Sequence, residues 1–375
     1  MTYSIHKVTS KSDKKQFINF PHDLYQDDVN YVPELSLSIS EVLSEKKNPF
    51  FKHSEADLFL AKDENGKIVG RIAAILNNNY NSYYNANSGF FGFFDSVNNQ
   101  EVANLLLTTA VDWVKNKGVN KIIGPTNFTT NDTAGVLVDG FDSPPVVMMT
   151  YNKAYYIELL ENFGLTKEMD LFAYNLETSL VSKKSLKVAQ LLEERLERNG
   201  ITIRTMSKKT QKQDILKIKD TYRKAWEKNW GFVPPTDEEF DHLAEGLLLI
   251  LDRDFVFLAE KDGQVIGFAV IVPNINEITK SFKKGSLFPF NIFKLLLRKS
   301  KVKSVRVILL GIEEQYRKIG IAPIFFARTI QTAIDKGVER GEASWILENN
   351  QAMVQAADGL NGDKYKTYRL YSKEI

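Results

Sequence analysis

A hairpin-like segment occurs twice in the chain. Residues 57–76 read DLFLAKDENGKIVGRIAAIL, and residues 254–272 read DFVFLAEKDGQVIGFAVIV. In both copies an apolar run is followed by a polar turn with glycine and then by a second apolar run, the pattern of two paired β-strands. Each copy leads to a further strand and then to a helix that ends in Lys-Gly-Val, at 117–119 and at 336–338. The sequence therefore predicts an internal duplication at the scale of a domain.

The duplication divides the 375-residue chain into two parts. We expect a first domain over residues 1–180, a linker helix over 181–200 and a second domain over 201–375. Apolar strands alternate with amphipathic helices in both domains, so the expected fold class is α/β, with a mixed central sheet of α+β type flanked by helices in each. The second copy carries an insertion at 274–303, directly after its hairpin.

The composition excludes several kinds of chemistry. The chain has no cysteine, which rules out disulfides, thiolate metal ligands and a thiol nucleophile. Its four histidines show no metal-ligand spacing, so we expect no metal site. A net charge of +2 argues against DNA as a partner.

The N-terminal residues lack the apolar core of a signal peptide, and no apolar run approaches the roughly 18 residues of a spanning helix. We therefore expect a cytoplasmic protein.

A strand-turn-helix segment near the C-terminus carries the most specific motif. Residues 305–312 form an apolar run rich in β-branched residues, and an amphipathic helix follows a short polar turn and stops at Gly337. At the joint, Arg317, Gly320 and Ala322 form the pattern R-x-x-G-x-A. The N–H groups at such a helix start suit a phosphate or pyrophosphate, which glycine lets approach closely. The other interpretation is an ordinary strand-helix-strand crossover with a glycine in its turn.

At these residues the chain resembles the GNAT N-acetyltransferase superfamily, whose signature Q/R-x-x-G-x-G/A binds the pyrophosphate of coenzyme A. The elements that follow are similar to the second half of the GNAT fold: a strand at 343–347, a short helix opened by residues 348–350 and a last strand at 365–371. The resemblance implies two tandem GNAT-like domains and acetyl-CoA or a longer acyl-CoA as co-substrate. The residues that it implies for cofactor binding are Gly311, Ile312, Arg317, Lys318, Ile319, Gly320, Ile321, Ala322 and Asn350.

The first copy lacks this motif. Its joint at 96–101 has neither arginine nor glycine, so we expect a degenerate GNAT half that serves structure or acceptor binding. A long loop at 124–156 is dense in polar and turn residues, which indicates either a binding site or a surface loop whose side chains satisfy turns. In the second half, two aromatic residues either line an acceptor site or anchor the core. The expected substrate-binding residues are Asn127, Asn131, Asp132, Trp230 and Phe232.

Amide formation from a thioester needs a base for the amine, a donor for the carbonyl oxyanion and a proton for the thiolate. The resemblance implies a backbone N–H near Gly311 or Ile312 as the oxyanion donor. Carboxylates at the strand ends are candidate bases, and tyrosines of the last strand are candidate acids. The alternative is that the carboxylates are solvated turn residues and that the tyrosines only pack within the strand. The set comprises Glu313, Glu314, Glu348, Tyr365, Tyr368 and Tyr371, of which we select Glu313, Glu348 and Tyr368 as catalytic.

The whole chain is similar to a set of bacterial tandem-GNAT proteins, some of which resemble bacterial ceramide synthases. The segments that carry this resemblance lie at 48–51, 89–94, 124–132, 229–234, 344–350 and 365–371. It implies transfer of an acyl group, in the ceramide-synthase case a long one, to a small-molecule or lipid amine such as a sphingoid base. Two alternatives stay open. One is an aminoacyl-tRNA-dependent transferase, and the other is a non-catalytic protein that binds CoA or acyl-CoA.

The insertion combines basic and apolar residues. From residue 278 to residue 312 there are nine basic side chains and no acidic one. Such a mixture favours contact of residues 278–303 with a membrane surface, an anionic lipid or the phosphates of a long-chain donor. Contact with a membrane would make the protein peripheral at the inner membrane face. RNA is a competing partner that the rest of the chain does not favour. A solvated lysine face beside a packed hairpin is the third interpretation.

Overall fold

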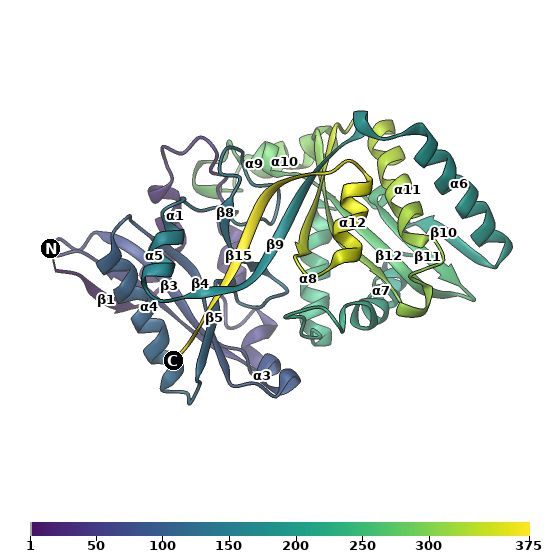
Figure 1. The fold of residues 1–375 in the computed structure, drawn as a ribbon. Coiled ribbons are helices and arrows are strands. Elements are labelled where there is room, and N and C mark those ends of the chain that lie inside the picture. Colours follow the sequence, from purple (N-terminus) through teal and green to yellow (C-terminus); the bar gives the residue numbers. More distant parts are fainter. Residues whose placement is uncertain (1) are drawn as a thin grey trace. The chain divides into compact units, whose positions relative to one another are not determined.

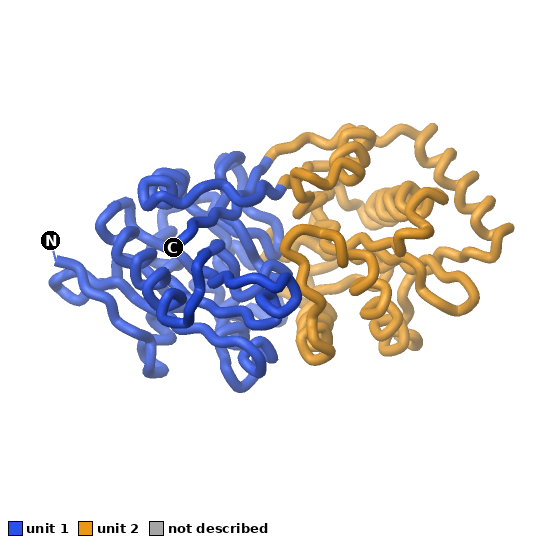
Figure 2. The backbone as a smooth tube through the Cα atoms, turned by 60° about the horizontal axis from the view of Figure 1, so that its bottom comes forward, with its two compact units in different colours: residues 1–171, 279–294, 366–375 blue, residues 172–278, 295–365 orange. Residues whose placement is uncertain are grey.

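The computed structural model describes residues 2–375 and contains two compact units (Figures 1 and 2). Unit 1 comprises residues 1–171, 279–294 and 366–375, and unit 2 comprises residues 172–278 and 295–365. The units therefore differ from the consecutive ranges 1–180 and 201–375. Each unit contains a mixed β-sheet with helices packed against it, which confirms the predicted α/β class.

The sheet of unit 1 is antiparallel except for one parallel pair, β4 with β5. Its strands, in order across the sheet, are β1 (Ser4–Lys7), β2 (Glu55–Lys62), β3 (Ile68–Leu76), β4 (Ser88–Ser96), β5 (Lys121–Gly124) and β15 (Asp363–Glu374). Its helices are α1 (Lys11–Leu24), α2 (Ser36–Val42), α3 (Asn78–Tyr84), α4 (Gln100–Lys115) and α5 (Tyr156–Asn162). Three short strands follow β5: β6 (Thr126–Asn127), β7 (Thr133–Ala134) and β8 (Val136–Asp139).

Unit 2 repeats this arrangement, with β13 and β14 as its parallel pair. Its strands, in order, are β9 (Thr166–Glu177), β14 (Arg340–Leu347), β13 (Ser304–Ile312), β12 (Gln264–Pro273), β11 (Val256–Lys261) and β10 (Ile201–Thr205). Its helices are α6 (Lys183–Arg198), α7 (Gln211–Trp226), α8 (Asp237–Ile250), α11 (Ile321–Asp335) and α12 (Gln351–Gly359). The insertion between β12 and β13 contains α9 (Asn276–Thr279) and α10 (Asn291–Arg298).

Corresponding helices pack against the sheets of the two units. In unit 1, α4 begins at Asn99, whose side chain accepts a hydrogen bond from Val102 N at 3.1 Å. Apolar residues recur every three or four positions along α4, which places Leu106 and Val114 against the sheet in one buried cluster. In unit 2, α11 is the counterpart, and Phe325 lies in the corresponding cluster. The predicted duplication thus appears as the same order of strands and helix in both units.

The last strand of each half of the sequence belongs to the sheet of the other half. β15 ends the chain, yet its residues from Tyr371 to Glu374 pair with β5 of unit 1. β9 ends the first half, yet it lies next to β14 in the strand order, and its residues from Phe172 onward belong to unit 2. We call this arrangement the strand exchange. Each unit therefore needs residues from both halves of the sequence to complete its sheet.

Candidate active site

The parallel strands β13 and β14 pair over only part of their length. Ser304 to Val307 pair with Arg340 to Ala343, and there the register between the two strands ends. β13 continues to Ile312 and remains paired with β12, after a register shift that leaves Ile308 as an extra residue. The edge of β13 beyond Val307 is consequently not covered by β14. We call this place the opening. An extended ligand arm with amide groups can pair with such a strand edge.

The opening ends at a helix start that suits an anion. Gly320 precedes α11 in a left-handed conformation, with φ of 102°, and provides no side-chain cap. The first N–H groups of α11 therefore remain available to a ligand at the positive end of the helix dipole. Pro323 lies in this first turn, where its missing N–H costs nothing. The predicted strand-turn-helix geometry is thus present at the predicted residues.

Arg317 connects the turn to another part of unit 2. Its Nη2 donates to the carbonyl oxygen of Ala225 at 2.8 Å, and its Nε donates to that of Ile312 at 3.2 Å. The guanidinium thereby joins the end of β13 to the last turn of α7. Lys318 is exposed. Both charges lie in the turn before Gly320, where they add positive potential to the helix start.

A glycine at the end of β13 makes room for an aromatic ring. A Cβ atom on Gly311 would lie 2.1 Å from Cζ3 of Trp226, so a larger residue would displace that ring. Trp226 in turn stacks on Phe268, with 5.6 Å between ring centroids. Phe232 is buried and packs edge-on against Tyr222 as a core residue, whereas Trp230 is only half-buried. Of the two predicted acceptor aromatics, only Trp230 is partly accessible.

The predicted catalytic carboxylates of unit 2 lie at strand ends. Glu313 follows β13 and receives a 2.8 Å hydrogen bond from Lys224 Nζ, with 14% of its side chain exposed. Glu314 is exposed, and its hydrogen bond from Lys228 lowers the pKa of its carboxyl. Glu348 directly follows β14 and is half-buried. Asn350 caps α12, since its Oδ1 accepts from Met353 N at 3.3 Å.

A buried polar cluster, which sequence reasoning missed, lies where β13 and β14 part. Glu342 and Arg306 are opposite each other, one pair before the register ends, and both are only 3% exposed. The carboxylate of Glu342 accepts hydrogen bonds from the hydroxyls of Ser344 and Tyr365, and Arg306 Nε donates to Ser344 Oγ at 2.9 Å. The predicted strand begins at residue 343, one residue after Glu342, so no sequence signal marks this glutamate as buried. Such a group needs partners and is often functional.

The corresponding place in unit 1 is filled. β4 pairs with β5 only from Ser88 to Phe90, so the strands diverge there as well. A Cβ atom on Gly92 would lie 1.7 Å from the carbonyl oxygen of Thr126, and Asn127 Oδ1 accepts from Phe93 N at 2.7 Å. The chain after β5 therefore occupies the space between the strands. The two units therefore differ at this place, which is open in unit 2 and packed by the chain itself in unit 1.

The other site residues predicted for the first half have local partners. Asp132 accepts hydrogen bonds from Thr129, through both its backbone N–H and its hydroxyl, which makes Asp132 part of a turn. Asn131 N donates to the same hydroxyl at 3.1 Å. Tyr368, the predicted acid, is fully buried in unit 1, whereas Glu313 and Glu348 belong to unit 2. Of these residues, Glu313 and Glu348 share unit 2 with the opening.

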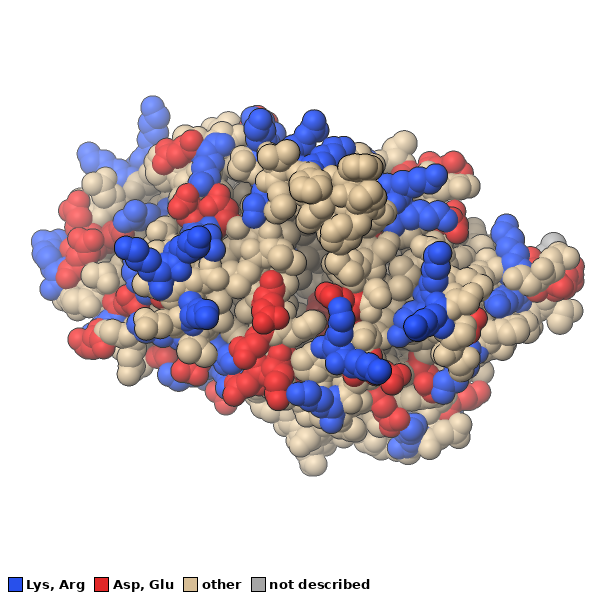
Figure 3. Space-filling model, turned by 180° about the vertical axis from the view of Figure 1, so that it is seen from behind, with Lys and Arg blue, Asp and Glu red and all other residues tan. Residues whose placement is uncertain are grey.

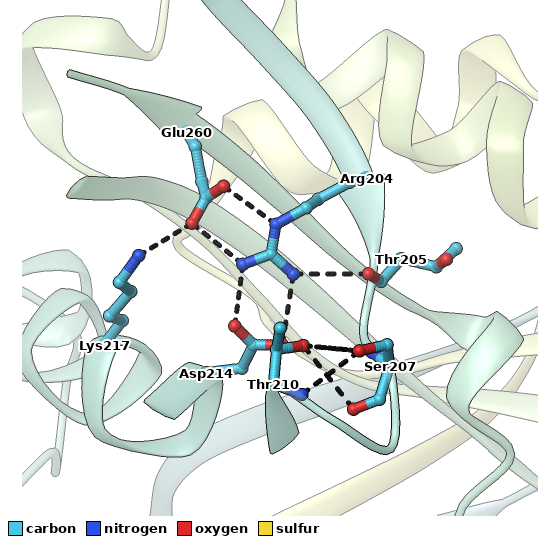
Figure 4. Close-up of polar contacts among 7 residues, drawn as sticks. All are labelled: Arg204, Thr205, Ser207, Thr210, Asp214, Lys217 and Glu260. Carbon is cyan, nitrogen blue, oxygen red and sulfur yellow. Dashed lines mark hydrogen bonds and ion pairs between the residues drawn. The ribbon is translucent and has the colours of Figure 1, made fainter. Parts of the chain in front are cut away.

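A second polar cluster in unit 2 serves the fold. Arg204 of β10 donates two hydrogen bonds to Asp214 and two to Glu260, at 2.7–3.1 Å, and Lys217 also donates to Glu260 (Figure 4). These contacts lower the pKa of Glu260 to about 2, mainly through Arg204. Thr205 of the same strand also lines an open pocket of about 550 Å³. The cluster ties α7 to the edge of the sheet.

Residues 2–375 contain neither a group of metal-ligating side chains nor a membrane-spanning helix. Within this range, no three His, Asp or Glu side chains lie so that they could hold a metal ion together. Of the helices described, none has the length and apolar character required to cross a bilayer.

Solved structures with this fold are GNAT proteins. The chain matches a tandem GNAT protein from the clavulanic acid biosynthesis pathway with a TM-score of 0.59, covering 100% of this chain and 98% of that chain at 9% identity. It matches a GCN5-related N-acetyltransferase from Sphaerobacter thermophilus with a TM-score of 0.54, covering 99% and 95% at 12% identity. No family model matches the sequence. The predicted resemblance is confirmed at the level of the fold, which is that of tandem GNAT proteins.

Two relatives match over almost their full length. Protein YghO of Escherichia coli (strain K12) is 35% identical over 373 residues, which is 98% of this chain and 94% of the relative. The bacterial ceramide synthase of Caulobacter vibrioides (strain NA1000 / CB15N) is 33% identical over 382 residues, covering 99% and 97%. The chain belongs to the family that contains these two proteins.

Proposed function

We propose that the chain transfers an acyl group from a coenzyme A thioester to an amine. The observation that carries this proposal is the opening between β13 and β14, which leads to the uncapped start of α11 at Gly320. The strand edge suits the amide groups of the pantetheine arm, and the helix start suits the pyrophosphate. Because the acyl-CoA pool is cytoplasmic, we place the reaction there.

The residues around the opening suggest how the transfer proceeds. The amine attacks the thioester carbonyl directly, since a chain without cysteine has no thiol to carry the acyl group. A backbone N–H near Gly311 or Ile312 stabilises the oxyanion, and a carboxylate accepts the proton that the amine loses. The new amide bond replaces the thioester bond, and the thiolate leaves as the thiol after it takes up a proton.

We propose a long-chain acyl group and a lipid amine, such as a sphingoid base, as the substrates. The name of the relative from Caulobacter vibrioides supports this choice. The partly exposed apolar residues of β13 beyond Val307 are compatible with an acyl chain at the opening. The test is incubation with palmitoyl-CoA and sphinganine, in parallel with acetyl-CoA and with water-soluble amines. The released thiol can be titrated without background, because the protein contains no cysteine.

The Gly320→Ala substitution tests the anion site. The left-handed φ of 102° strains any residue with a Cβ, although the nearest side-chain atoms, on Leu192, would be 3.5 Å away. We expect CoA to bind at least about tenfold more weakly, because a shift of this backbone misplaces the N–H groups at the helix start. Calorimetric titration with CoA measures the change.

Gly337→Ala is the matched control for this substitution. Gly337 also has a positive φ, of 68°, and a Cβ atom on it would meet no other atom within 4 Å, but it lies at the other end of α11. We expect this variant to bind CoA as the wild type does, even if its thermal midpoint falls by a similar amount. Equal CoA affinity of Gly320→Ala and the wild type would refute the anion site. Turnover with an aminoacyl-tRNA, but with no acyl-CoA, would refute the proposal that a coenzyme A thioester is the acyl donor.

A further inference from the structure

The insertion between β12 and β13 carries an exposed apolar face. Phe290 is 79% exposed, Phe293 is 63% exposed and Leu297 is 74% exposed. Phe290 directly precedes α10, and Phe293 and Leu297 are four positions apart on one side of that helix. Phe288 and Leu296 are exposed next to them, at 62% and 52%. We call these five residues the apolar face. Large apolar side chains grouped in this way on a surface mark a contact with another apolar body.

The segment beneath this face is firmly attached. Leu295, on the opposite side of α10, and Phe282 are buried. Lys294 lies above the ring of Phe282, at 5.7 Å from its centroid, and donates to Ser281 Oγ at 2.7 Å. Ser36 Oγ also donates to the carbonyl oxygen of Lys284 at 2.6 Å. The apolar face is therefore a built surface on an anchored segment, and its exposure does not reflect a loose loop.

Basic side chains without an acidic partner accompany the apolar face. Lys280, Lys283, Arg298 and Lys301 are exposed, and none of them forms an ion pair with a carboxylate of residues 2–375. In the view of Figure 3, uncharged side chains protrude at the upper edge, where α10 lies, and blue side chains stand beside them. A solvated lysine face beside a packed hairpin would not by itself account for the exposure of the phenylalanines.

We propose that α10 and its flanking residues dock onto the surface of an anionic lipid bilayer. The chemistry is complementary, because the phenylalanine and leucine side chains can enter the boundary of the acyl chains while the lysines and Arg298 meet the phosphate groups. Nucleic acid would leave five exposed apolar side chains without a matching surface. The docking surface goes beyond the proposed acyl transfer, and it stands whether or not the acceptor is a lipid.

Vesicle sedimentation of the full chain tests this proposal. The vesicles contain phosphatidylcholine alone or an equal mixture with phosphatidylglycerol. We expect the protein to sediment with the mixed vesicles, and to be released as salt screens the charges. The combined variant Phe290→Ser, Phe293→Ser and Leu297→Ser should bind the mixed vesicles at least about tenfold more weakly. The variant Lys283→Gln, Arg298→Gln and Lys301→Gln should lose both affinity and salt dependence.

A matched control separates the apolar face from apolar exposure in general. Val188, Leu191 and Leu216 are 49–58% exposed on α6 and α7, so their replacement by serine removes exposed apolar surface elsewhere, although less of it than in the variant of the apolar face. We expect this variant to sediment like the wild type. Unchanged thermal midpoints would show that all variants are folded. A Phe293→Trp variant should additionally show a blue-shifted emission with mixed vesicles, and quenching by brominated acyl chains.

Three results would overturn the proposal. The first is a wild-type protein that stays in the supernatant with mixed vesicles at low salt. The second is equal sedimentation of the wild type and the serine variant of the apolar face. The third is that this face joins two copies of the chain or binds RNA. Analytical ultracentrifugation without lipid and titration with single-stranded RNA detect these two cases. None of these readouts depends on acyl transfer, so failure here leaves the proposed function to its own test.

Discussion

At the scale of single residues, Glu342 is the most informative position. It is buried in β14, and two hydroxyl groups hold its carboxylate in place one residue pair before the opening begins. The buried Arg306 lies opposite it on β13. A buried carboxylate of this kind is often functional. We therefore regard Glu342 as a further candidate, beside Glu313, for the proton acceptor of the amine.

The Glu342→Gln substitution should reduce kcat by about 100-fold, the effect typical of a lost general base, while the KM for acyl-CoA changes little. Glutamine keeps the size of the side chain, so the fold should persist. Thiol release, measured across a range of pH, gives both constants and shows whether the acid limb of the profile disappears. Glu313→Gln is the control. Loss of kcat in the control alone would assign the base to Glu313.

Local signals predicted the site loop, whereas long-range contacts could not be predicted. Gly320, Pro323 and Gly337 delimit a helix through their own backbone preferences, so their roles follow from the sequence. The bond from Arg317 to Ala225 joins residues that are far apart in the chain, and no periodicity indicates it. The contact of Asn127 with β4 in unit 1 could not be predicted either. A polar loop residue looks the same in the sequence whether its side chain binds a ligand or a neighbouring strand.

At the scale of elements, β10, α7 and β11 depend on charges as well as on apolar packing. Arg204 lies between the nearly buried Asp214 and Glu260, and all of its charge-assisted hydrogen bonds connect different elements. The contacts of Arg204 with Glu260 should weaken in acid, because protonation removes the negative charge of the Glu260 carboxylate. Of these elements, β11 pairs with β12, which in turn pairs with the β13 strand of the opening.

Glu260 should contribute to stability above its unfolded pKa and lose this contribution in acid. Its pKa in the folded chain is about 2, below the ordinary value of 4.5. The contribution is therefore complete above about pH 4.5 and declines as the pH falls toward 2. We expect Glu260→Gln to lower the free energy of unfolding near pH 7, and by less near pH 3. Urea titrations at both pH values measure the difference. An equal loss at both would exclude the ionised carboxylate as its cause.

At the scale of the whole molecule, the strand exchange makes the halves of the sequence depend on each other. Residues 1–180 lack β15, the second neighbour of β5, and residues 201–375 lack β9, the second neighbour of β14. The sequence revealed the duplication through its repeated hairpins, but strand pairing across a long stretch of chain leaves no local pattern. The compact units therefore could not be delimited from repeats alone.

Fragments 1–180 and 201–375 should each fail to fold when produced alone. Each would expose an uncovered strand edge and part of a core, which favours aggregation. We expect neither fragment to unfold cooperatively on heating, and co-production to restore a complex that does. Circular dichroism and size-exclusion chromatography measure both outcomes. Cooperative unfolding of 201–375 alone, together with CoA binding, would show that the exchange is dispensable.

The strand exchange also bears on how a duplicated protein of this kind can evolve. A duplicated gene usually stays free to discard the copy whose activity has decayed. Here the strand exchange removes that freedom, because loss of the first half would also remove β9 from the sheet of the second. Selection on the second half therefore also maintains the buried core of the first, because each sheet is completed by a strand from the other half.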